Sequence, residues 1–457
     1  MSDIDEFDVI VLGAGPAGEV CAGKLAEGDL SVALVEQELI GGECSFWACM
    51  PSKALLRPAQ ALAETRRVEG AAQAVTGSLD VAAALLRRDE IIHDLDDSGH
   101  LPWVEDRGIS LVRGHGVLEG ERRLRVGERL LTARRAIVLA PGSRAALPPI
   151  PGLREAQPWT NREATTAHVI PASLLVLGGG VVAVELAQAY ASLGAHVTVV
   201  ETMERLISRE EPFASELVGD ALRQVGVEVA LGAKATAVER EAGGAVTLCL
   251  DDGRSLAAEQ LLVAVGREAN TAAVGLESVD LEGGGAVEVD DTMRVAGNDW
   301  LYVIGDANGR VLLTHMGKYQ ARLVADRILG RAGSLRSDGP LSPRVIFTDP
   351  QVAAVGHTLA GARSAGLSVR AVDQSIDAVA GSSFVGHGAP GTARIVIDEE
   401  REVLVGATFV GVEVAEWLHA ATIAVIGEVP LARLAHAIPA FPTRSEVWLK
   451  LIETAIR

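Results

Sequence analysis

Two cysteines, Cys44 and Cys49, have the residue type and the spacing that redox chemistry requires. They lie in the stretch Gly-Gly-Glu-Cys-Ser-Phe-Trp-Ala-Cys-Met-Pro-Ser-Lys, which ends at Lys53. In a regular α-helix their Cα atoms would be roughly 8–9 Å apart, beyond the ~7 Å limit for a disulfide. We therefore expect a distortion at the start of this segment and a helix that begins near Pro51. A thiol at that helix start should have a lowered pKa, as a thiolate that relays electrons needs.

Two other interpretations of the pair stay open, namely two unpaired buried cysteines and a zinc site. Zinc is disfavoured because no second Cys or His pair lies nearby at ligand spacing, so we predict no metal ligands. The chain has 4 cysteines in 457 residues, too few for a disulfide framework. In a reducing compartment, a close pair favours catalysis or metal binding. We expect the remaining two, Cys21 and Cys249, to be inert core residues.

The thiol pair follows a Gly-rich turn that is typical of a dinucleotide-binding βαβ unit. An apolar run at residues 7–12 predicts a buried parallel strand before the turn. Gly13 allows the tight turn, Gly15 lets the backbone approach a pyrophosphate, and Gly18 lets the helix pack closely on the strand. The helix N-terminus adds N–H donors, and Glu36, at the end of the next strand, would accept a hydrogen bond from a ribose hydroxyl. A Gly-rich turn without a ligand is the disfavoured alternative, because strand, helix and acid are all in place.

The same design recurs after a strand predicted at residues 174–177. Gly178 and Gly180 match the first two glycines, whereas Ala183 replaces the third. Glu201 ends the following strand, at the same spacing as the acid of the first unit. A carboxylate there accepts from a ribose 2′-hydroxyl and repels a 2′-phosphate, so NADH is favoured over NADPH. NADPH stays open, because alanine in the third position also occurs in NADP-binding proteins.

Charge and composition argue against several classes of partner. The net charge of −20 at pH 7 disfavours nucleic acids and anionic membranes. The N-terminus is acidic and lacks the basic start of a secretory signal. No run of about 18 apolar residues is uninterrupted by polar or charged residues, so we predict no membrane span. We therefore expect a cytoplasmic protein.

The length of the chain, 457 residues, is too great for one core, and roughly 150 residues per domain predicts about three domains. Residues 59–104 are predicted to be helical, and short strands follow. A strand at 301–306 would carry Asp306 at its C-terminal end. A Pro-rich connector at 148–152 and a polar linker at 331–340 mark domain boundaries.

Together these features resemble the class I flavoprotein disulfide reductases, the family that includes dihydrolipoamide dehydrogenase, glutathione reductase and mercuric reductase. The similarity extends over essentially the whole chain, and the C-x4-C-x-P-S-K segment is highly specific. The other matching stretches are Leu-Ala-Pro-Gly-Ser-Arg at 139–144, Gly-Arg-Glu-Ala-Asn-Thr at 266–271, Ile-Gly-Asp at 304–306 and Phe-Thr-Asp-Pro at 347–350.

The resemblance implies an α/β fold with two Rossmann-like dinucleotide-binding domains, for FAD and NAD, and a C-terminal α+β dimerisation domain. The expected boundaries are residues 1–148 and 267–335 for the FAD domain, 149–266 for the NAD(P) domain and 341–457 for the dimerisation domain.

The resemblance also implies roles for single residues around the flavin. Asp306 would hold a ribityl hydroxyl of FAD. Thr314 and His315 would begin a helix whose N-terminus faces the pyrimidine edge, where the helix dipole stabilises the anionic reduced flavin. A purely structural His315 stays open as an alternative. The predicted cofactor-binding residues are Gly13, Gly15, Gly18, Glu36, Gly42, Gly142, Asp306, Thr314, His315, Gly178, Gly180, Glu201, Gly266 and Arg267.

By the same resemblance, Cys49 is the thiol against the flavin ring and Cys44 is the interchange thiol that meets the substrate. Lys53 would lie by flavin N5 and pair with Glu185 from the second βαβ unit. The alternative for Lys53 is a surface lysine on a helix. With Glu446, these four residues form the predicted catalytic set.

The chain departs from the family at its C-terminus. Lipoamide and glutathione reductases end with a His-Pro-Thr-x-x-Glu motif, whose histidine crosses the dimer interface and is the acid/base for the interchange thiol. Residues 441–446 here are Phe-Pro-Thr-Arg-Ser-Glu, so Phe441 replaces that histidine. His436, five residues upstream, could swing in, but we expect it to lie on a helix.

These inferences predict a homodimeric, FAD-dependent NAD(P)H oxidoreductase. Hydride would pass from nicotinamide to FAD and on to the Cys44–Cys49 disulfide, and then to a disulfide, quinone or metal acceptor. The disulfide could be a small molecule or a protein. Loss of an acid/base, commonly worth 10²–10⁴-fold, would make ordinary dithiol exchange poor. Two alternatives stay open: a dihydrolipoamide dehydrogenase with a displaced histidine, and a flavin-bearing redox sensor or partner subunit without turnover.

Overall fold

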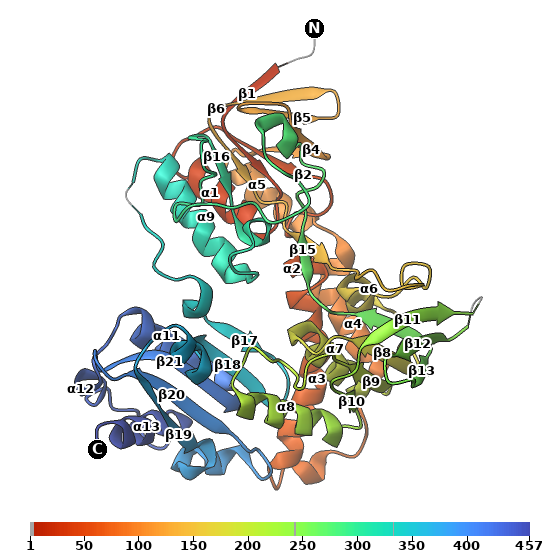
Figure 1. Cartoon of the computed structure of the whole chain (residues 1–457), viewed down its shortest axis with the longest axis vertical. Coiled ribbons are helices and arrows are strands. Elements are labelled where there is room, and N and C mark those ends of the chain that lie inside the picture. The colour runs from red at the N-terminus through yellow and green to blue at the C-terminus, as the bar shows by residue number, and fades with distance from the viewer. Residues whose placement is uncertain (1–3, 242–243, 332) are drawn as a thin grey trace. The chain divides into compact units, whose positions relative to one another are not determined.

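The computed structural model describes residues 4–241, 244–331 and 333–457. Internal contacts divide the chain into two compact units, which Figure 1 draws in one view. Unit 1 consists of Met1–Pro51, Asp89–Ala146 and Gly266–Gly339, and unit 2 of Ser52–Arg88, Leu147–Val265 and Pro340–Arg457. Each unit therefore combines segments that lie far apart in the sequence.

Unit 1 is built on a seven-stranded sheet with the order β3-β2-β1-β6-β5-β4, in which β16 also pairs with β6. The strands β3, β2, β1, β6 and β16 run parallel, whereas β5 pairs antiparallel with both β4 and β6. The strands are β1 (Ile4–Leu12), β2 (Val32–Glu36), β3 (Ser110–Arg113), β4 (Gly116–Leu118), β5 (Arg123–Val126), β6 (Arg129–Leu139) and β16 (Leu301–Val303).

The two faces of this sheet bury alternate residues of each strand, as the period of a β-strand requires. Val9 and Val11 belong to the core that also contains α1 (Pro16–Ala26) and α9 (Thr314–Ile328). Both helices lie side by side near β1 and β6 (Figure 1). A Cβ on Gly317 would come within 3.2 Å of Ala17 Cβ. The first turns of the two helices therefore touch.

The remaining elements of unit 1 are short. They are α2 (Gly42–Phe46), α5 (Leu101–Asp106) and a two-stranded antiparallel pair of β7 (Ser143–Ala145) and β15 (Arg267–Ala269). A 3-10 turn, η5 (Gly305–Asn308), follows β16.

Unit 2 contains the second βαβ unit, on a parallel four-stranded sheet with the order β10-β9-β8-β14. A three-stranded antiparallel sheet, β11-β12-β13, shares a hydrophobic core with this parallel sheet. The elements are α3 (Cys49–Arg67, in unit 2 from Ser52), α4 (Val81–Ile91), α6 (Asn161–Thr166), β8 (Ser173–Leu177), α7 (Val181–Ser192), β9 (His196–Val200), α8 (Pro212–Gln224), β10 (Glu228–Ala230), β11 (Ala235–Arg240), β12 (Val246–Leu250), β13 (Ser255–Ala258) and β14 (Gln260–Val263).

The C-terminal part of unit 2 is a five-stranded antiparallel sheet with the order β17-β18-β21-β20-β19. Its inner face packs against α11 and α13 around Phe409. The elements are β17 (Arg344–Ile346), β18 (Gln351–Gly356), α10 (Leu359–Ser364), β19 (Val369–Ser375), β20 (Thr392–Asp398), β21 (Val403–Gly411), α11 (Leu418–Ile426), α12 (Leu431–Leu434) and α13 (Val447–Ala455).

The α/β fold with two βαβ units and a C-terminal α+β domain is confirmed. The stretch at 59–104 is helical as predicted and contains α4 and parts of α3 and α5, and Gly70, with φ +92°, lies in the break after α3. One local prediction was wrong. The strand predicted at 301–306 ends at Val303, because Gly305, with φ +70°, turns the chain into η5. The limits of the three predicted domains stay predictions. Within the described residues, no helix combines the length and the apolarity needed to span a membrane.

Candidate active site

Cys44 and Cys49 lie on two different helices, which confirms the predicted distortion. Cys44 is on α2, which ends at Phe46, and Trp47 leaves the helical region with φ −133° and ψ 0°. Cys49 is the first residue of α3. The break permits the two sulfurs to approach, and both side chains are present as half-buried thiols.

The Thr314 hydroxyl meets both sulfurs. It donates a hydrogen bond to Cys44 Sγ at 3.2 Å and lies 3.4 Å from Cys49 Sγ. The hydrogen bond with Cys49 raises the pKa of the Cys44 thiol far above its usual range, and burial raises it further, whereas Thr314 and Lys318 act in the opposite direction. The expected lowering of a thiol pKa therefore does not apply to Cys44, which precedes α3 and lies beside a second sulfur.

The Gly-rich loop after β1 has the shape that a dinucleotide pyrophosphate needs. Gly13 adopts φ +100°, and a Cβ there would lie 2.2 Å from Ala140 O. A Cβ on Gly18 would lie 1.8 Å from Gly13 O, so only glycine allows the helix this close to the strand. By contrast, a Cβ on Gly15, the N-cap of α1, would point into open space. The cradle at this helix N-terminus therefore fits the pyrophosphate of FAD.

Glu36 ends β2 and points back at this loop. Its Oε2 accepts from Ala14 N at 2.7 Å and its Oε1 accepts from Glu38 N at 2.7 Å. Burial raises the pKa of the Glu36 carboxyl, and the two backbone N–H groups oppose this effect. The carboxylate is therefore fixed beside the loop, as a ribose ligand would be.

Asp306 belongs to a cluster that sequence reasoning found only in part. Ser143 Oγ donates to Asp306 Oδ2 at 2.5 Å, and Arg267 Nε donates to the same Ser143 Oγ at 2.6 Å. Arg267 also reaches Glu43 on α2 at 3.4 Å. Ser143 and Glu43 were missed, although Ser143 stands in the matched stretch 139–144 and Glu43 directly precedes Cys44.

The other cofactor residues predicted in unit 1 lie on the same group of loops. A Cβ on Gly42 would come within 2.9 Å of Gly15 Cα, so the chain before the thiols passes close to the pyrophosphate loop. Positions 142 and 266 flank the β7–β15 pair, and an added Cβ would meet nothing within 4 Å at either glycine. His315, the second residue of α9, is exposed.

In unit 2, Lys53 and Glu185 form an ion pair of 2.6 Å, in which Glu185 is almost fully buried. The other oxygen of Glu185 accepts from Phe347 N at 2.8 Å, and the Lys53 ammonium lies 4.9 Å from the centre of the Phe347 ring. The predicted contact is thus present, and Phe347 is a further neighbour that the Phe-Thr-Asp-Pro stretch could have indicated.

The second Gly-rich loop repeats the geometry of the first. Gly178 adopts φ +112°, a Cβ on Gly180 would face open space, and Ala183 is fully buried against the strand. A Cβ on Gly179 would meet Glu201 Oε2 at 2.7 Å, so the Glu201 carboxylate lies against the loop. The residues therefore fit a second dinucleotide.

At the C-terminus, Phe441 is 76% exposed. His436 is exposed in the turn after α12, so the prediction that it lies on a helix was wrong by two residues. Glu446 Oε2 is buried and has no hydrogen-bond partner among the described residues.

Cys21 is a core residue, and burial raises the pKa of its thiol to about 12. Cys249 is only half-buried, which corrects the prediction that it is a core residue.

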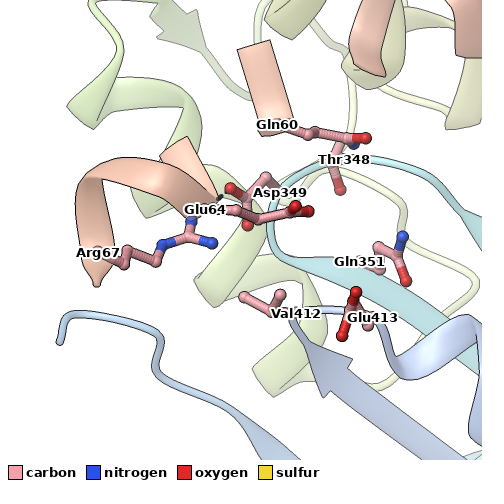
Figure 2. A pocket seen from close by; sticks show the side chains of 8 residues that line it. All are labelled: Gln60, Glu64, Arg67, Thr348, Asp349, Gln351, Val412 and Glu413. Atoms are coloured by element: carbon pink, nitrogen blue, oxygen red, sulfur yellow. Dashed lines mark hydrogen bonds and ion pairs between the residues drawn. The ribbon is translucent and has the colours of Figure 1, made fainter. Parts of the chain in front are cut away.

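A separate recess in unit 2 contains none of the predicted site residues. Figure 2 shows Arg67 pointing from α3 toward Asp349, with which it forms an ion pair. Among the described residues no group of three or more His, Cys, Asp or Glu could hold a metal ion. The recess is lined by Gln60, Glu64, Arg67, Thr348, Asp349, Gln351, Val412 and Glu413.

Comparison with known proteins decides the family. The model of the pyridine nucleotide-disulphide oxidoreductases matches residues 7–321, and that of their dimerisation domain matches residues 342–452. The chain is a pyridine nucleotide-disulphide oxidoreductase. As a member of this family it is a FAD-dependent enzyme that uses NAD(P)H, which confirms the predicted enzyme class.

Relatives of this pyridine nucleotide-disulphide oxidoreductase include several enzymes of known activity. The mercuric reductase of Acidithiobacillus ferrooxidans is 32% identical over 456 residues, which cover 97% of this chain and 82% of that protein. The dihydrolipoyl dehydrogenase of Chlorobaculum parvum is 32% identical over 454 residues, which cover 96% of this chain and 95% of that protein.

Two solved structures share the fold of this pyridine nucleotide-disulphide oxidoreductase. The HOCl-induced flavoprotein disulfide reductase RclA from Escherichia coli has a TM-score of 0.85 at 24% identity, covering 98% of this chain and 99% of that one. LpdA from Mycobacterium tuberculosis has a TM-score of 0.86 at 22% identity, covering 99% of this chain and 100% of that one.

Proposed function

We propose that the enzyme uses Cys44 and Cys49 as a redox-active disulfide that passes electrons from NADH to a disulfide, quinone or metal acceptor. One observation carries the proposal: both sulfurs contact Thr314, in the same unit as the Gly-rich loop that fits FAD. Bound FAD would supply two-electron transfer between NAD(P)H and the thiol pair.

The protein's own groups would bind and orient the two nucleotides. The N-terminus of α1 would donate to the FAD pyrophosphate, Glu36 would accept from the adenosine ribose, and Asp306, fixed by Ser143, would accept from a ribityl hydroxyl. Glu185 holds the Lys53 side chain in one orientation, so that its ammonium remains a fixed positive charge on the first turns of α3.

We expect a lower KM for NADH than for NADPH, because the Glu201 carboxylate against the second loop would repel a 2′-phosphate. Arg205 follows Glu201 closely in sequence, and a free guanidinium there would favour a 2′-phosphate. The Arg205 guanidinium instead donates to Ser208 O at 2.7 Å and to Glu210 O at 3.2 Å. Steady-state kinetics with both nucleotides test this, and Glu201→Ala should narrow the difference. A tenfold wild-type preference for NADPH would contradict it.

The acceptor is proposed from the missing histidine. Phe441 cannot move a proton, so the acceptor would be an unusual disulfide or a species that needs no proton relay, such as a quinone or a metal ion. The related mercuric reductase is named for a metal substrate, and a structure of RclA is titled as a Cu(II) complex. The second candidate is dihydrolipoamide oxidation with His436 as the base, in keeping with the name of the related dihydrolipoyl dehydrogenase.

We also propose that the enzyme is a homodimer. Residues 342–452 match the family's dimerisation domain. Within this domain Ile438 and Phe441 are 70% and 76% exposed, which is unusual for large apolar side chains. A second copy of the chain would cover them.

Anaerobic titration with NADH tests the central proposal. The protein should take up more than the two electrons that its flavin alone accepts, because the disulfide accepts two more. The Cys44→Ser, Cys49→Ser double variant should take up only the flavin's two electrons. Equal uptake by both proteins would contradict the redox role. A screen of lipoamide, glutathione disulfide, quinones, Hg(II) and Cu(II) would then identify the acceptor class.

A further inference from the structure

The contacts of the Thr314 side chain are not explained by its place at the start of the helix that is expected to face the flavin. The backbone of α9 begins at this residue, and any residue type would supply the helix N-terminus. Its side chain, however, lies between two sulfurs that are 5 residues apart in sequence and about 270 residues away from it. The hydroxyl is 3.2 Å from one sulfur and 3.4 Å from the other. A hydroxyl can donate one hydrogen bond and accept another, so the Thr314 side chain can contact both sulfurs at once.

Three groups with an effect on the pKa of the Cys44 thiol are the Cys49 sulfur, the Thr314 hydroxyl and the charge of Lys318. Lys318 lies one helical turn after Thr314 on α9. Thr314 and Lys318 both favour the ionised sulfur, the first by a hydrogen bond and the second by its positive charge. Phe441 offers no base from the C-terminal motif. Thr314 and Lys318 therefore both act on this sulfur from α9.

We propose that Thr314 is a positioning residue for the thiol pair. Its hydroxyl donates a hydrogen bond to the Cys44 sulfur when this is ionised. Thr314 thereby supplies, from α9, part of the stabilisation that the absent histidine would give. This inference rests on the proposed redox role of Cys44 and Cys49. It concerns the side chain of Thr314 and not the helix N-terminus that would face the flavin.

The step that this contact would assist is thiol–disulfide exchange. The Cys44 thiolate attacks one sulfur of an acceptor disulfide, a Cys44–acceptor disulfide forms, and one acceptor thiolate leaves. The Cys49 thiolate then attacks Cys44 Sγ, the Cys44–Cys49 disulfide re-forms, and the second acceptor thiolate leaves. Two electrons pass to the acceptor and both released thiolates take up protons. Thr314 is not consumed, because it only lowers the free energy of the thiolate that attacks.

Alkylation of the reduced holoprotein tests the inference without NADH or acceptor. The protein is reduced chemically, the reductant is removed under argon, and iodoacetamide labelling of Cys44 is followed by peptide mass spectrometry across a pH series. Thr314→Val keeps the shape and removes the hydroxyl, so the thiolate loses a donor. The midpoint for Cys44 should then rise by about one pH unit, which is about tenfold slower labelling below the midpoint. Thr314→Ser, which keeps the hydroxyl, should label like the wild type.

Thr422→Val is the matched control, because the Thr422 hydroxyl donates to Leu418 O within α11. It should leave the profile unchanged. If Thr314→Val does not fold, Thr314→Ala removes the same hydroxyl. An unchanged midpoint in the folded hydroxyl-free variant, or a shift of equal size in Thr314→Ser, would overturn the inference. If the midpoint shifts but the Cys44→Ser, Cys49→Ser pair takes up as many electrons as the wild type, the proposed function fails and the thiol contact stands.

Discussion

Cys44 and Cys49 differ in their surroundings, although they form one pair. Cys44 lies on α2, where hydrogen bonding to Cys49 and burial both raise the pKa of its thiol. Cys49 lies at the first residue of α3, where a helix dipole favours negative charge. This difference supports the assignment of Cys49 as the thiolate against the flavin and Cys44 as the interchange thiol.

The assignment predicts a difference between two serine variants. The two-electron-reduced wild type should show long-wavelength absorbance from a thiolate against the flavin. Cys49→Ser should lose it, and Cys44→Ser should retain it. Anaerobic absorbance spectra measure both. Loss of the band in Cys44→Ser together with its presence in Cys49→Ser would reverse the two roles.

Replacement of Phe441 by histidine should raise disulfide reductase activity. Wild-type turnover of lipoamide and glutathione disulfide should be weak, since Phe441 has no titratable group. An imidazole there would restore an acid/base, which is commonly worth 10²–10⁴-fold, and the exposure of Phe441 leaves room for it. His436→Ala should change little. Efficient wild-type lipoamide turnover that His436→Ala abolishes would instead identify His436 as the base.

At the scale of elements, two glycines of the β1–α1 loop allow the effects on packing and on cofactor binding to be measured separately. Gly18→Ala places a methyl group 1.8 Å from Gly13 O and should lower the free energy of unfolding by at least the ~1–3 kcal/mol of an overpacked core. Gly15→Ala meets no protein atom within 4 Å and has an ordinary φ of −68°. It should fold normally but bind FAD on the order of tenfold more weakly, because the methyl group occupies the cradle.

Denaturant unfolding of the apoproteins and fluorescence titration with FAD measure the two effects of these loop variants. Gly70→Ala, at another position where a Cβ would meet nothing, is unsuitable as a control because φ is +92° there. Gly77→Ala, which lies in open space without positive φ, is the better one. Unchanged FAD affinity in Gly15→Ala would show that the pyrophosphate does not lie on this loop.

At the scale of the whole molecule, the exposed apolar residues of the C-terminal domain predict association. Sedimentation at micromolar concentration should give a dimer, and Ile438→Asp should shift it toward monomer, because a charge would be buried in the interface. Val169→Asp, at a residue that is 75% exposed outside that domain, is the control. A fully active wild-type monomer would assign residues 342–452 another role.

The sequence alone determined the features that depend on local chemistry. Glycine spacing predicted both βαβ units, because close approach and positive φ at Gly13 and Gly178 admit little else. The C-x4-C spacing predicted the helix break, since a regular helix holds such cysteines too far apart.

Only the tertiary structure decided which distant side chains meet. Thr314 reaches Cys44 across 270 residues, and Ser143 reaches Asp306 across 163. Cys249 proved half-buried, although its strand pattern predicted a core position. Local periodicity says which face of an element is apolar. It does not say which side chain of another element lies opposite, because that depends on how the elements pack in three dimensions.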